Sequence, residues 1–155
     1  MRLVPLVAAV TLASALTACG APTTDLDAAG VIQALAKQGM PVTLTVAYDA
    51  SNDPNKLLGR PNGYTSKASF TDRRVDPSKT SAAKPGDVEL GGSVEVFASA
   101  DEAEARAAYI GEIGKKLPML GEYDYVKGSV LVRVSRELTP TDAQPYEAAL
   151  GKIVE

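Results

Sequence analysis

The chain has 155 residues, of which 16 are Lys or Arg, 19 are Asp or Glu, none is His and one is Cys, so its formal net charge is −3. An acidic balance with scattered basic residues argues against nonspecific nucleic-acid binding, which needs a basic face. The composition also excludes Ser-His-Asp and Cys-His mechanisms and metal sites built from histidine.

The amino-terminal segment has the layout of a secretory signal. Met1 and Arg2 form a short cationic start, and residues 3–16 are mostly apolar or small. This run is shorter than the roughly 18 apolar residues that a membrane-spanning helix requires. We therefore expect a cleavable signal rather than a permanent transmembrane helix.

The segment ends in Leu16-Thr17-Ala18-Cys19, followed by Gly20. This motif resembles a bacterial lipobox. The resemblance implies that the Cys19 sulfur receives a diacylglyceryl group, that the chain is cut just before it, and that the new amino terminus is acylated, as in palmitate-bearing lipoproteins. Two or three acyl chains, at about 0.8 kcal/mol per buried CH₂, hold a protein stably to a membrane. The implied location is the cell membrane, facing the outside or the periplasm.

The motif divides the chain into three parts. Residues 1–18 are expected to be the lipoprotein signal peptide, residues 19–23 the lipidated cysteine and a short tether, and residues 24–155 a single domain. A domain of this length can form a modest core without a metal or a disulfide.

Three segments show helical periodicity: residues 24–39, 99–117 and 142–154. Thr24 begins a T-x-x-D capping pattern with Asp27, and Ser99 forms a capping box with Glu102. Pro145 must lie in the first turn of the third helix.

Five segments show strand patterns: residues 42–48, 64–70, 94–98, 122–126 and 129–136. Lys127-Gly128 is expected to be the turn of a hairpin between the last two strands. The order of elements predicts an α+β fold with an antiparallel sheet of about five strands and helices packed on one face.

The loop over residues 49–63 is the most distinctive part of the predicted domain. Arg60 and Tyr64 are carried on a turn formed by Gly59, Pro61, Asn62 and Gly63, and both residue types are common anchors in protein interfaces. Arg60, Tyr64 and Asp49 are therefore the candidate binding patch. In the alternative, Arg60 caps a carbonyl or pairs with Asp49, while Tyr64 packs as a strand aromatic.

The loops contain two partial motifs. Ser81 and Lys84 have S-x-x-K spacing, but the companion motifs of penicillin-recognising enzymes are missing, which favours solvated loop residues. Residues 49–55 offer alternate oxygen ligands like an EF-hand, yet Pro54 stands where Gly is needed and Arg60 where Glu should close the shell. Asx-turn capping is the better interpretation, and we expect neither a metal nor a cofactor.

The whole chain resembles the small, alanine-rich, uncharacterised lipoproteins of actinobacteria. We expect a noncatalytic, lipid-anchored binding module of the cell envelope, with an envelope or extracellular protein as partner and no role in nucleic-acid binding. An inhibitor-like protein or a phage superinfection-exclusion lipoprotein is the alternative. A carboxylate-dependent enzyme would need a pocket that joins two carboxylates, or Arg60 with Asp49 and Tyr64.

Overall fold

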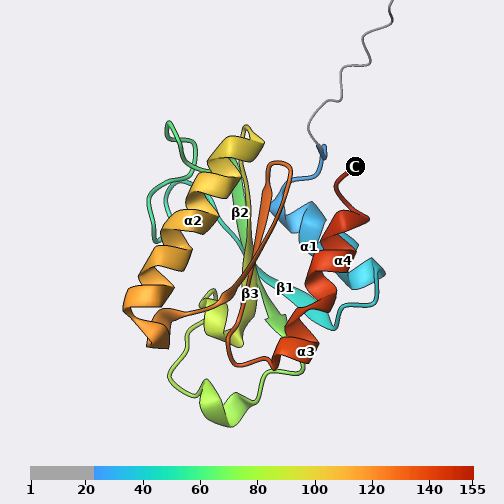
Figure 1. The fold of residues 1–155 in the computed structure, drawn as a ribbon, viewed down its shortest axis with the longest axis vertical. Helices are drawn as coiled ribbons and strands as arrows, with labels where there is room; N and C mark the ends of the chain where they lie inside the picture. The colour runs from blue at the N-terminus through green and yellow to red at the C-terminus, as the bar shows by residue number, and fades with distance from the viewer. Residues whose placement is uncertain (1–22) are drawn as a thin grey trace, which may run out of the picture.

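The computed structural model describes residues 23–155, so the predicted signal peptide and Cys19 lie outside the described residues. Figure 1 shows the fold. Its elements in chain order are α1 (Ala28–Lys37), β1 (Val42–Ala47), β2 (Ser66–Asp72), β3 (Gly91–Val96), α2 (Ala100–Lys116), β4 (Tyr123–Lys127), β5 (Val130–Val134), α3 (Pro140–Ala143) and α4 (Pro145–Gly151), with short 3₁₀ turns at Pro77–Lys79, Val88–Leu90 and Pro118–Leu120. Over the described range, no helix has the length and apolar character needed to cross a bilayer.

The five strands form one antiparallel sheet in the order β1-β2-β3-β5-β4. This confirms the predicted α+β class and the number of strands. In the β4–β5 hairpin, Lys127 pairs with Val130, so the turn residues are Gly128 and Ser129. The turn lies one residue later than predicted because Gly128, at φ 52°, takes its first position.

The helices cover both faces of the sheet, which corrects the prediction that they pack on one face. Figure 1 shows α2 on one side of the sheet and α1 and α4 on the other. Alternate residues of β5 divide accordingly: Val130, Val132 and Val134 pack in one core cluster with α1 and α4, and Leu131 packs in a second cluster with Ala103 of α2. Helical periodicity predicts an apolar stripe but not the sheet face that receives it, so α2 was misplaced.

The ends of the helices follow the predicted capping logic with one correction. Asp27, not Thr24, is the N-cap of α1, and its Oδ1 accepts a hydrogen bond from the Gly30 N–H at 2.7 Å. Ser99 caps α2 as predicted, accepting from the Glu102 N–H at 3.3 Å. The expected third helix is split, since α3 ends before Pro145 starts α4.

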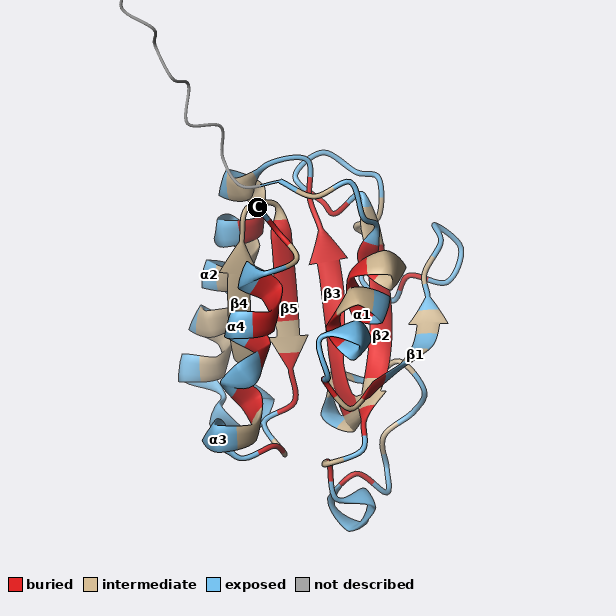
Figure 2. Cartoon of the chain, turned by 90° about the vertical axis from the view of Figure 1, so that its right-hand side faces the viewer, coloured by how far each residue is buried: buried red, intermediate tan, exposed pale blue. Residues whose placement is uncertain are grey.

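The two faces of the sheet differ in chemistry. Figure 2 shows that the central strands β2, β3 and β5, which contribute side chains to both faces, are mostly buried. The face under α1 and α4, here called the apolar face, carries buried valines and Phe70, whose ring stacks on Tyr146 at 5.7 Å. The face under α2, here called the α2 face, receives the alternate residues of the same strands. These include Lys67, Glu95 and Arg133, which are not apolar.

Candidate binding cleft

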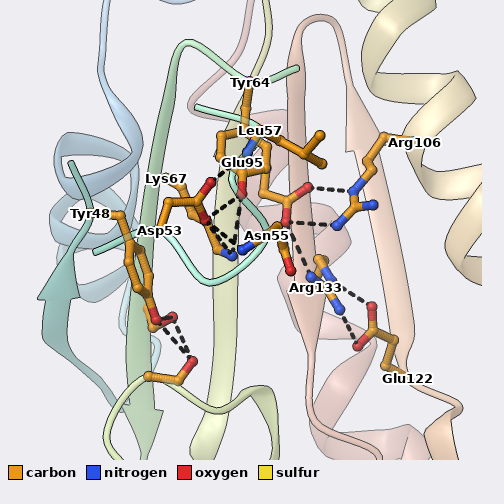
Figure 3. Close-up of polar contacts among 12 residues, drawn as sticks. Tyr48, Asp53, Asn55, Leu57, Tyr64, Lys67, Glu95, Arg106, Glu122 and Arg133 are labelled. Carbon is orange, nitrogen blue, oxygen red and sulfur yellow. Dashed lines mark hydrogen bonds and ion pairs between the residues drawn. The ribbon is translucent and has the colours of Figure 1, made fainter. Parts of the chain in front are cut away.

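A network of charged side chains lies on the α2 face. Glu95 of β3 is fully buried, and its carboxylate accepts hydrogen bonds from Arg106 Nε at 2.9 Å and Arg133 Nη1 at 3.1 Å. Arg133 also donates to both carboxylate oxygens of Glu122, at 2.6 and 3.0 Å. Figure 3 shows Arg106 reaching from α2 to this network, here called the charged floor. Each carboxylate is therefore held by charge-assisted hydrogen bonds.

Lys67 of β2 lies beside this floor and is itself buried. Its Nζ is 3.5 Å from both Asp53 Oδ1 and the Tyr64 hydroxyl, and 4.8 Å from the centre of the Tyr48 ring. Burial lowers the pKa of Lys67, while the negative charges of Glu95 and Asp53 oppose that change. Long contacts of this kind leave the ammonium group only weakly hydrogen-bonded.

Asp53 organises the loop that precedes β2. Its carboxylate accepts hydrogen bonds from the Tyr64 hydroxyl at 2.6 Å and from the backbone N–H groups of Leu57 and Leu58 at 2.8 and 3.1 Å. Burial alone would raise the pKa of Asp53, but these bonds lower it to about 2. The ionised carboxylate thus fixes the loop against the edge of the α2 face.

Asp124 of β4 lies in a different environment on the same face. One carboxylate oxygen, Oδ1, is buried and has no hydrogen-bond partner among residues 23–155. Burial and the nearby carboxylate of Glu122 raise the pKa of Asp124 to about 7. This carboxyl group therefore changes its charge near neutral pH.

A cleft of about 730 Å³ opens between α2, the charged floor and the surrounding loops. Three large apolar side chains at its rim are exposed: Tyr109 by 60%, Met119 by 74% and Leu120 by 50%. The remaining lining residues are Pro54, Asn55, Leu57, Lys67, Gly86, Asp87, Val88, Glu89, Arg106, Ile110, Ile113, Gly121, Glu122, Arg133, Ser135 and Arg136. A gathering of exposed apolar groups around a hollow of this size is typical of a binding site.

The predicted patch of Arg60, Tyr64 and Asp49 does not form. Tyr64 is fully buried, and its ring packs edge-on against Phe97 at 6.0 Å, so the alternative of a packed aromatic is confirmed. Arg60 is exposed. The Asp49 carboxylate accepts hydrogen bonds from Ser51 and Asn52 of its own turn, which confirms the predicted Asx-turn. Exposure was the wrong expectation for Tyr64 because Asp53 provides a buried partner for its hydroxyl.

The residues of the cleft were not singled out from the sequence, although part of the signal was present. Alternate positions of β2 and β3 are polar or charged, as in Lys67 and Glu95, and β5 carries one such residue, Arg133. Such alternation predicts one polar face on a sheet. Met119 and Leu120 gave no signal, since apolar residues in a short turn are exposed or buried according to tertiary packing alone.

No protein-family model matches the chain, and neither the curated proteins nor the solved structures contain a match to it. The arrangement on the α2 face offers an apolar rim for contact over polar groups that are mostly paired.

Proposed function

We propose that the protein is a lipid-anchored, noncatalytic binding module of the bacterial cell envelope that holds a partner in the cleft beside α2. The supporting observation is the cleft itself, with Tyr109, Met119 and Leu120 exposed at its rim. Of the carboxylates of the charged floor, Glu95 is held by two arginines and Glu122, which lines the cleft, by Arg133. A carboxylate fixed in this way is a poor general base, whereas apolar rim groups gain free energy when a partner covers them.

The direction of the anchor favours a partner from the aqueous side. The described chain starts at Thr23, whose N–H donates to the carbonyl oxygen of Glu155. Figure 1 shows this end of the molecule near the start of α2, while the end of α2 points towards the opposite end. Residues 20–23 reach at most about 3.6 Å each from Cys19. With Cys19 lipidated, the Pro118–Leu120 turn that follows α2 would lie at the end of the domain away from the anchor.

A matched pair of variants tests the cleft. Leu120→Glu places a charge on the rim, and Leu26→Glu makes the same change at another exposed leucine outside the cleft. The lipidated protein would be used to capture partners from detergent-solubilised envelope. We expect Leu120→Glu to lose a partner that Leu26→Glu retains. Equal capture by both variants would contradict the cleft as the binding site.

A separate experiment tests the anchor. Cys19→Ser removes the sulfur that the lipobox resemblance assigns to lipidation. We expect the variant to lose acyl-chain labelling and to leave the membrane fraction. Retention of the variant in the membrane as an integral protein would show that residues 1–18 anchor the chain as a helix.

A further inference from the structure

The cleft continues along α2 into a second hollow. This hollow has a volume of about 440 Å³ and shares Leu57, Arg106 and Tyr109 with the cleft. Together the two hollows are lined by α2 residues from Asp101 to Ile113. At about 1.5 Å per residue, this stretch of helix rises roughly 18 Å. The two hollows therefore form one groove, here called the α2 groove, that is long enough for an extended ligand.

The cations that line the α2 groove already have partners. Each of them forms an ion pair, and the pairs are Lys67–Asp53, Arg106–Glu95, Arg133–Glu95, Arg133–Glu122 and Arg136–Glu137. Four cations and four carboxylates take part in these pairs, so the set has no net charge. It offers no uncompensated positive charge to a ligand.

Other carboxylates in the lining have no cation beside them. They are Asp87, Glu89, Asp101 and Glu102, and within residues 23–155 none of them forms an ion pair. The Asp87 and Glu102 side chains accept backbone N–H groups, whereas those of Glu89 and Asp101 accept no hydrogen bond from the described residues. The α2 groove therefore has an excess of negative charge.

The unpaired carboxylates lie at opposite ends of the α2 groove. Asp87 and Glu89 precede β3 in the chain, and Asp101 and Glu102 follow it. The six residues of β3 span about 20 Å, at roughly 3.3 Å per residue. Tyr109, which is 60% exposed, lines both hollows and so lies between the two acidic ends. A complementary ligand carries positive charge towards both ends and apolar groups between them.

We propose that the α2 groove binds an extended segment of a partner protein that has a basic side chain towards each end and apolar side chains between them. One basic group pairs with Asp87 and Glu89, and the other pairs with Asp101. The apolar groups pack on Tyr109 and Met119. This inference rests on the proposed binding function and names the class of partner.

A peptide satisfies the α2 groove better than a polyamine does. A polyamine can reach both acidic ends, but its thin chain leaves the Met119 and Leu120 side chains uncovered, and these are 74% and 50% exposed. Apolar side chains of a peptide can cover both residues, which removes their apolar surface from water and gains free energy.

The first test compares two probes that differ only in charge. A fluorescent peptide capped at both ends, Gly-Lys-Ser-Leu-Leu-Ser-Leu-Lys-Gly, and the same peptide with Gln in place of both Lys would be titrated onto the full lipidated protein in nanodiscs of uncharged phosphatidylcholine. The two lysines are about 20 Å apart in an extended chain. We expect the Lys peptide to bind at least about tenfold more tightly, with a smaller ratio at high salt. Equal affinities would overturn the proposal, even where capture that depends on Leu120 persists.

Variants of the protein locate the effect. The double variant Glu89→Gln with Asp101→Asn removes one charge from each end, at exposed positions, and should lose most of the preference for the Lys peptide. The control is Glu104→Gln with Glu147→Gln, which makes the same change in charge at exposed positions outside both hollows and should keep the preference. All four substitutions are at exposed residues, so both melting temperatures should stay close to that of the native chain. Full preference in the first variant, or an equal loss in both, would overturn the assignment.

Two further probes test the class of ligand. A peptide of the same composition with both lysines side by side at one end should bind more weakly than the spaced peptide, because it neutralises only one end of the α2 groove. Spermine should displace the labelled peptide only at higher concentration than the unlabelled peptide does. Equal affinity of the two Lys peptides, or displacement by spermine at the lower concentration, would overturn the proposed peptide.

Discussion

The two faces of the sheet are built from the same strands but differ in what they contain. On the apolar face, Val94 and Val132 pack under α1 and α4 without a polar atom in the side chain. Their sequence neighbours Glu95 and Arg133 lie on the α2 face as an ion pair. The comparison teaches that one face supplies the larger apolar core, while the other combines a smaller apolar cluster with charged groups at fixed positions beside a cleft.

The two faces also contribute differently to the free energy of folding. Burying an apolar side chain contributes about 1.5 to 3 kcal/mol. A buried ion pair contributes little net stability, because desolvation offsets the attraction between its members. The intact charged floor therefore adds little net stability, although removing one member leaves its partners buried without a counter-charge.

The largest expected effect comes from the apolar face. Phe70 is almost completely buried and stacks on Tyr146, so Phe70→Ala should lower the free energy of unfolding by about 3 to 5 kcal/mol. Chemical denaturation monitored by circular dichroism measures this loss. A loss below about 1 kcal/mol would show that the apolar face is not the main core.

Breaking the charged floor should have a somewhat smaller effect. Glu95→Gln removes the charge that faces two partly buried arginines, and we expect a loss of roughly 3 kcal/mol. The control is Glu112→Gln, which breaks an exposed ion pair with Lys115 and should change stability by less than about 0.5 kcal/mol. Similar values for both variants would mean that the floor is solvated rather than buried.

Asp124, on the α2 face, should make the free energy of unfolding depend on pH. The folded protein raises the pKa of this group above its unfolded value, so the stabilising protonated form is lost as pH rises through about 7. Asp124→Asn should therefore be more stable than the native chain at pH 9, with a smaller difference at pH 5. Unfolding curves at the two pH values measure this, and a constant difference would contradict the shifted pKa.

The smallest effect is expected in the loop before β2. Arg60→Ala, at an exposed position, should change the free energy of unfolding by no more than about 0.5 kcal/mol. Tyr64→Phe, its comparison, removes the hydroxyl that donates to Asp53 and should cost about 1.5 to 3 kcal/mol. If thermal unfolding shows a larger loss of stability for Arg60→Ala than for Tyr64→Phe, then Arg60 has a structural role.

Local patterns predicted most of the fold because its elements carry their own signals. The Ser99 cap and the alternating valines of β5 are readable from neighbouring residues alone. The cleft was not predictable, because it depends on α2 packing across β4 and β5 from the second side of the sheet. The burial of Tyr64 could not be predicted from local sequence either, because it depends on Asp53 accepting a hydrogen bond from its hydroxyl across the loop.

The most direct test of a binding role for the α2 face is site-specific photo-crosslinking in the membrane-anchored protein. A photoreactive amino acid would replace Met119 at the cleft rim or Gln33 on the exposed side of α1. The account predicts a discrete adduct from the Met119 position that disappears in the Tyr109→Ala background, and none from the Gln33 position. The same adduct from both positions, or an adduct from Gln33 alone, would contradict it.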